Sequence, residues 1–153
     1  MMSEVLSEEL FELLNGRDLS KKQHAAMMLL TVSEDMWPHT AMVSAGEVLA
    51  LSETELRFAI WPHTETTNNM KRTQKAMLVV VYKGKVNYMK LTLEELPDLL
   101  RPKYERARFA AKIESVRTDI AKYADITSGV TIQLKDPEAA LERWKGTLEE
   151  LKK

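Results

Sequence analysis

The side chains best suited to chemistry lie in one short polar segment between two apolar runs. The first run ends at Trp61, and the turn after it is rich in hydroxyl and amide groups. The pattern predicts a short helix that starts in this turn and ends near Thr73. The first N–H groups of a helix lack partners inside it, so this turn is a candidate anion site. Its polar residues are Thr64, Glu65, Thr66, Thr67, Asn68 and Asn69.

Most other patterns that carry chemistry are missing. The chain has no cysteine, so disulfides, thiolate chemistry and cysteine-ligated metals are excluded. His24, His39 and His63 share no helical ligand spacing, so no local metal site is predicted, although each histidine stays a candidate zinc or haem ligand. No glycine-rich phosphate loop, nucleophile elbow or acid–base carboxylate pair occurs. The catalytic residues are therefore unknown, and any reaction is expected to depend on a bound cofactor.

Composition narrows the function classes further. The 22 Lys and Arg residues nearly balance the 23 Asp and Glu residues, which argues against a dedicated nucleic-acid binder. No apolar run approaches the length of a membrane helix, and the N-terminus lacks a basic-then-apolar signal, so we expect a cytoplasmic protein without a membrane partner. A chain of 153 residues predicts a single domain, 1–153.

The order of the predicted elements indicates a mainly β fold. Short turns between alternating runs favour antiparallel pairing, so a small antiparallel barrel with peripheral helices is expected. Leu93–Tyr104 contains two prolines and is expected to form a short helix or loop. The predicted helices are Ser3–Leu14, the piece ending near Thr73, and one that opens at Asp136-Pro137 with Leu141, Trp144, Leu148 and Leu151 on one face. The six or seven predicted strands are His24–Val32, His39–Ala45 with a bulged extension over Glu47–Leu51, Leu56–Trp61, Ala76–Val81, Val86–Leu93, Arg108–Asp119 and Val130–Leu134.

These elements resemble the pyridoxamine 5′-phosphate oxidase-like family, the FMN-binding split barrels. In that pattern a strand opens with proline, as at Pro38–Ser44, and an apolar strand follows, as at Leu56–Trp61. A Ser-x-Lys-x-x-Asn-Leu turn and helix comes next, where this chain has Thr64 through Met70, and then a basic segment and the Val-rich run. The portion from Ala124 to Trp144 also resembles a branch of this superfamily. The resemblance implies a six- to seven-stranded antiparallel split β-barrel with N-terminal, middle and C-terminal helices.

The resemblance also implies a cofactor, a partner and a site. FMN is expected in grooves between the two subunits of a homodimer. One departure weakens the match, because Thr66 stands where the family has a phosphate-pairing lysine. Threonine hydroxyls are expected to replace it, with charge from Lys71, Arg72 or Arg57. The implied cofactor-binding residues are Met42, Val43, Ser44, Trp61, Thr64, Thr66, Thr67, Asn69 and Lys71.

Four functions are consistent with this reading. The first is an FMN-dependent oxidoreductase that acts on a small molecule or on flavin itself. The second is a non-catalytic FMN-binding protein that stores the cofactor or senses redox state. The third is haem binding on the same barrel, and the fourth is a barrel that has lost its cofactor.

Overall fold

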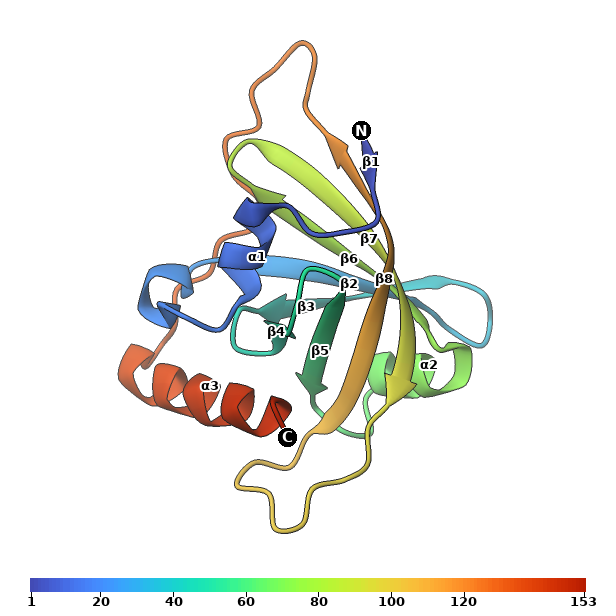
Figure 1. Ribbon diagram of the computed structural model, residues 1–153, viewed down its shortest axis with the longest axis vertical. Helices are drawn as coiled ribbons and strands as arrows, with labels where there is room; N and C mark the ends of the chain where they lie inside the picture. The colour runs from blue at the N-terminus through green and yellow to red at the C-terminus, as the bar shows by residue number, and fades with distance from the viewer.

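A computed structural model describes residues 1–153 as one curled sheet with helices around it (Figure 1). All strand pairs are antiparallel, in the order β3-β2-β6-β7-β8-β5-β4, and β1 adds to β8. The fold is therefore mainly β, and the predicted split barrel is confirmed. The strands are β1 (Met2–Ser3), β2 (Ala26–Val32), β3 (Pro38–Ser44), β4 (Val48–Ala50), β5 (Glu55–Ile60), β6 (Lys75–Tyr82), β7 (Lys85–Glu95) and β8 (Ala107–Asp119). The helices are α1 (Glu8–Leu14), the 3₁₀ turn η1 (Leu19–Lys22), α2 (Glu65–Thr73) and α3 (Pro137–Leu151).

The sheet curls around a core built from alternate positions of its strands. Side chains of successive strand residues point to opposite faces, so the apolar half of each strand lines the inside. The long strands β7 and β8 run through the middle of the sheet, with an irregularity between Lys90 and Leu91. β3 and β4 form the two edges and do not pair with each other. The largest fully buried side chains include Leu29, Leu56, Phe58, Met70, Leu78, Met89 and Phe109.

Helix caps follow the sequence signals. The Ser7 hydroxyl accepts from the Leu10 N–H at 3.2 Å to start α1, and the Asp136 carboxylate accepts from the Ala139 N–H at 3.2 Å to start α3. The predicted stripe of α3 faces the protein, since Trp144 and Leu148 are buried. None of the helices combines the length and apolar character that crossing a membrane requires.

Three predicted elements are corrected by the structure. Val130–Leu134 is not a strand. β2 is already paired on both sides, with β3 and β6, so this segment forms only an isolated bridge, between Thr131 and Ala25 just before β2. The predicted extension of β3 is the separate strand β4, which pairs with β5. The N-terminal helix begins at Glu8, since residues 2–3 pair with β8 as β1. Residues 96–106 form the loop that the two prolines permit.

Candidate functional site

The turn between β5 and α2 is fixed by its own threonines. Thr64 is the N-cap, and its hydroxyl accepts from the backbone N–H of Thr67 at 3.1 Å. The buried Thr67 hydroxyl donates to the Trp61 carbonyl at 2.6 Å. Two of the predicted phosphate donors therefore hold the turn in shape.

The first turn of α2 nevertheless keeps unused donors. The backbone N–H groups of Glu65 and Thr66 make no hydrogen bond, as expected for the start of a helix. The Thr66 side chain is 6% exposed, and its hydroxyl has no partner within the chain. These groups can accept an anion through hydrogen bonds, without the help of a positive charge.

Asn69 fixes the position of α2 against the β2–β3 hairpin. Its side chain is buried, and its amide donates to the hydroxyls of Thr31 at 3.0 Å and Ser33 at 3.3 Å. Its carbonyl oxygen accepts from the guanidinium of Arg72 at 3.1 Å. The role seen in the structure is to position the helix.

The basic side chains near this turn have other partners. Lys71 pairs with Glu95 at 3.3 Å. Arg72 donates to the Val32 carbonyl and to Asn69. Arg57 contacts Glu55 at 3.3 Å and donates to the Leu151 carbonyl at 2.8 Å. None of the three predicted sources of charge meets the first turn of α2 in this structure.

The free edge of β3 lies beside the start of α2. The His39 Nδ1 atom on β3 contacts the Glu65 carboxylate in the first turn of the helix. Farther along β3, Met42 is exposed, whereas Val43 and Ser44 are buried. An unpaired strand edge presents backbone donors and acceptors that another molecule can use.

Two aromatic and charged groups border the same edge. Trp61 is 60% exposed, and the Arg106 guanidinium lies 3.8 Å from the centre of its ring. Arg106 was not predicted as a site residue. The one sequence signal is its spacing of two residues from Arg108, which places both side chains on the same face of a strand.

Glu47 is the second group that sequence reasoning did not select. Its carboxylate accepts from the backbone N–H of Ser44 at 3.0 Å and from the Ser44 hydroxyl at 2.8 Å. Burial raises the pKa of Glu47, while the Ser44 hydrogen bonds and the charges of Arg106 and Arg143 oppose this rise. A carboxyl group of this kind can exchange a proton closer to neutral pH than an exposed one.

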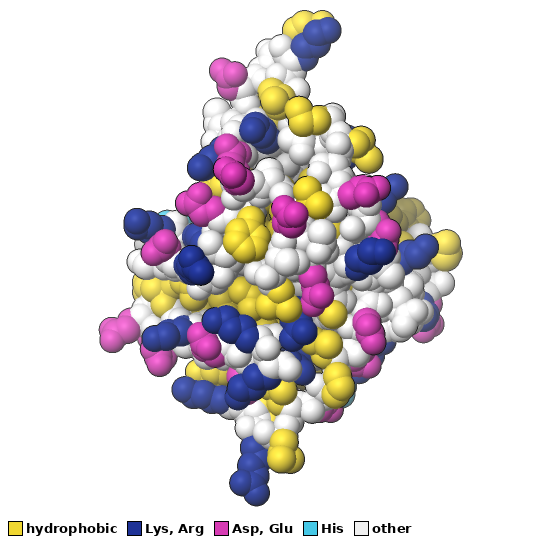
Figure 2. Space-filling view, viewed as in Figure 1, with side chains coloured by type: hydrophobic (Ala, Val, Ile, Leu, Met, Phe, Trp, Pro, Cys, Tyr) yellow, Lys and Arg dark blue, Asp and Glu magenta, His cyan; other side chains and the backbone are white.

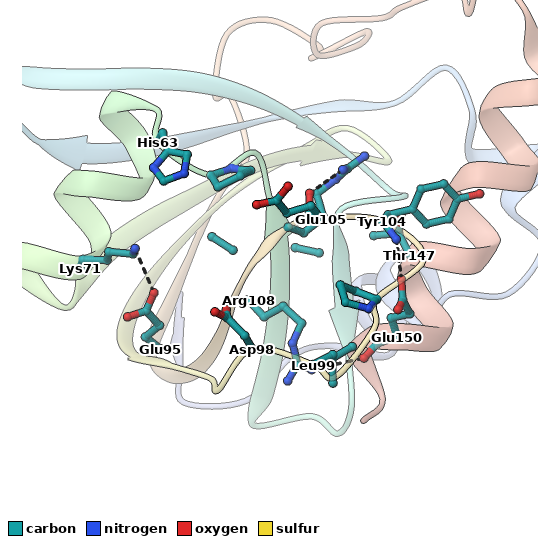
Figure 3. A pocket seen from close by; sticks show the side chains of 15 residues that line it. His63, Lys71, Glu95, Asp98, Leu99, Tyr104, Glu105, Arg108, Thr147 and Glu150 are labelled. Carbon is teal, nitrogen blue, oxygen red and sulfur yellow. Dashed lines mark hydrogen bonds and ion pairs between the residues drawn. The ribbon is translucent and has the colours of Figure 1, made fainter.

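A cavity of about 610 Å³ opens between α2, the 96–106 loop and the end of α3. Figure 3 shows His63 and Lys71 on one side of it and Thr147 and Glu150 on the other, with Arg108 between them. The Arg108 side chain is 8% exposed, and burial lowers its pKa. No group of three or more His, Cys, Asp or Glu side chains is placed to hold a metal ion.

Comparison with solved structures identifies the fold. A candidate pyridoxamine 5′-phosphate oxidase from Lactobacillus delbrueckii is 22% identical, with a TM-score of 0.59 over 75% of this chain and 95% of that chain. A variant of HupZ from group A Streptococcus is 12% identical, with a TM-score of 0.58 over 73% of this chain and 98% of the other. The fold that this chain shares with these structures is a split β-barrel, as the sequence resemblance predicted.

Sequence comparison gives a closer relationship. No family model matches the chain. The uncharacterized protein YclD of Bacillus subtilis (strain 168) is 55% identical over 148 residues, which are 97% of this chain and 96% of YclD. The chain belongs to the same family as YclD.

Proposed function

We propose that the protein binds FMN along the free edge of β3 at the start of α2, between two copies of the chain, and acts as an FMN-dependent oxidoreductase on a small molecule. The observation that carries the proposal is the His39–Glu65 contact, which joins the free strand edge to the first turn of α2. The two walls of the predicted groove are thus close together in space. Solved structures of a candidate pyridoxamine 5′-phosphate oxidase and of an F420 reductase share the fold.

The residues present fit the ring and ribityl chain of FMN better than its phosphate. The β3 backbone at Met42, Val43 and Ser44 has a free edge for the ring, and the exposed Trp61 offers a stacking face. The phosphate meets neutral donors, the N–H groups of Glu65 and Thr66 and the Thr66 hydroxyl. When bound, FMN supplies electron transfer at its ring.

The other predicted contacts act in support of this site. Thr64 and Thr67 hold the turn, and Asn69 holds the helix against β2, so these three side chains shape the phosphate site. Lys71 contributes charge only when its ion pair with Glu95 breaks. This pair lies at the surface and is of modest strength. Glu47, a carboxyl group with a raised pKa, shares a small cavity with Trp61.

A second copy of the chain fits the outer face of the sheet. Met28 on β2 lies between Met42 on β3 and Val79 on β6, and Leu30 lies beside Met77. All five side chains are partly or largely exposed in the single chain. An apolar sheet face of this kind is typical of a subunit interface, and a two-fold dimer is the commonest arrangement.

The visible spectrum tests cofactor binding. Protein incubated with FMN and passed through gel filtration is expected to keep the flavin absorbance, with riboflavin as the matched ligand that lacks the phosphate. Bleaching of bound FMN by reduced nicotinamide supports the oxidoreductase, whereas retention without bleaching supports a store or sensor.

One observation favours a second candidate, a barrel without a cofactor. Glu65 brings a negative charge to the first turn of α2, where its side chain contacts His39 and no lysine or arginine. A negative charge there opposes an anion. A colourless protein that does not bind added FMN would support this candidate. A Soret absorbance band after addition of haem would support the haem-binding alternative.

A further inference from the structure

The cavity between α2, the 96–106 loop and α3 contains two arginines without ion-pair partners. Arg106 and Arg108 stand two residues apart where β8 begins, so both side chains project from the same face of the sheet. No carboxylate lies within 4.0 Å of either guanidinium. Unpaired buried charges are costly, and proteins rarely keep them without a use.

Arg108 is the more deeply buried of the two. One terminal nitrogen donates to the Glu150 carbonyl at 3.2 Å, and the other donates to the Pro97 carbonyl at 2.9 Å. The Nε–H group has no partner at all. A guanidinium bound only to neutral carbonyls, with one buried donor unused, is prepared for an anion.

Arg106 is held beside Arg108 by stacking on Trp61. Its guanidinium lies over the Trp61 ring, and one nitrogen donates to the Glu105 carbonyl at 2.8 Å. Because stacking uses the face of the guanidinium, the edge that carries its remaining N–H groups is available to a ligand.

The four carboxylates of the cavity do not neutralise these arginines. Glu95 pairs with Lys71, and the Glu150 carboxylate accepts from the N–H groups of Lys103 at 3.0 Å and Tyr104 at 3.1 Å. The two other carboxylates belong to Asp98 and Glu105, which are exposed. Glu150 and Asp98 act on Arg108, and Glu47 and Glu150 act on Arg106, only from beyond ion-pair distance.

Packing and hydrogen bonds hold the 96–106 loop against its neighbours at the wall of the cavity. The Tyr104 ring packs on α3 so closely that a Cβ on Gly146 would lie 2.7 Å from its Cε2 atom. This contact and the Glu150 hydrogen bonds tie the loop to α3, and the Arg108–Pro97 bond ties it to β8. Figure 2 shows Lys and Arg side chains, with acidic ones among them, on the face where α3 and this loop lie.

We propose that this cavity binds a small molecule through an anionic group, a carboxylate or a phosphate, held between Arg106 and Arg108. The site is separate from the unpaired N–H groups of α2, although Trp61, Pro62 and His63 connect the two. The anion is assigned to a second ligand, because the proposed function places the phosphate of the flavin at α2, and the test below distinguishes the two sources.

Titration of the flavin-free protein with inorganic phosphate, followed by the ³¹P line width, tests the proposal. Wild-type protein is expected to broaden the phosphate line, and Arg106→Gln to weaken binding about tenfold by removing a charge-assisted donor. Asp98→Asn is expected to strengthen binding, because it removes a competing negative charge. Arg117→Gln is the control, since Arg117 lies elsewhere on β8 and pairs with Asp119.

The outcomes separate the proposal from its alternatives. Absence of broadening by the wild-type protein, or equal broadening by wild-type and Arg106→Gln proteins, overturns it whatever the result with FMN. Arg108→Gln is a second test, with circular dichroism to check that the C-terminus of α3 stays folded. If added FMN displaces the phosphate, the flavin is the source of the anion, and if both bind together, the anion belongs to a separate ligand.

Discussion

At the scale of single residues, the first turn of α2 combines neutral hydrogen-bond donors with one negative charge. The Thr66 hydroxyl and two N–H groups are without partners in the chain, while Glu65 carries the only negative charge of the turn and contacts His39. The threonine pattern predicted these donors from the sequence. The partners of Lys71, Arg72 and Arg57 were not predictable, because each depends on a strand or loop distant in sequence.

Removal of the Glu65 charge should therefore favour FMN. Glu65→Gln is expected to tighten binding about threefold, since a charge near a helix N-terminus contributes roughly 0.3–1 kcal/mol. The Kd is measured by quenching of flavin fluorescence, with Glu114→Gln on β8 as the control. Riboflavin should show little change, and an equal gain for riboflavin would mean that Glu65 acts on something other than the phosphate.

The buried carboxyl of Glu47 should link stability to pH. Its pKa is raised in the folded state, so the folded protein binds the proton more tightly and loses stability as pH rises from the unfolded pKa through the folded one. Glu47→Gln keeps the oxygen that Ser44 contacts and removes the charge, so it should raise Tm at pH 7 by about 2 °C. The gain should vanish below about pH 4, where an ordinary glutamate is protonated. Thermal unfolding against pH, with Glu94→Gln as control, checks this, and a gain that persists at low pH contradicts it.

At the scale of elements, local signals specified most of the fold. The Asp136-Pro137 start located α3, and the polar turn after Trp61 located α2. The errors arose where pairing decides the outcome. Residues 130–134 have the alternating pattern of a strand, but they form only one isolated bridge to the sheet. The 610 Å³ cavity was not predictable, because its walls come from three distant segments.

The packing of α3 on the β3–β4 turn gives a test of this architecture. A Cβ on Gly46 would lie 2.0 Å from Cγ of Trp144, so Gly46→Ala should destabilise the protein by about 2 kcal/mol through overpacking. In a Trp144→Leu background the cost should largely disappear, because the indole ring is gone. Urea unfolding of the four proteins measures the coupling. An unchanged cost in the second background would show that backbone strain, not the contact, is responsible.

At the scale of the whole molecule, the proposal places the FMN groove between two copies of the chain. The partly exposed face of Met28, Leu30 and Met77 is the surface that the proposal assigns to this contact. The sequence predicted alternating strands but could not say which face stays open, since that depends on how far the sheet curls.

A charge on this face should separate the subunits. Leu30→Lys is expected to convert a dimer to a monomer, because an unpaired lysine in an apolar interface loses its hydration. Light scattering after gel filtration measures the mass, with the exposed Glu94→Lys on β7 as control. FMN affinity should fall together with the mass, and a wild-type protein that is already monomeric would contradict the dimer.

The most direct test is the FMN affinity of Thr66→Glu. A second carboxylate at the buried first-turn position should weaken binding at least tenfold, about 1.4 kcal/mol, relative to wild-type protein in the same fluorescence titration. Unchanged affinity would place the phosphate elsewhere and contradict the proposed site.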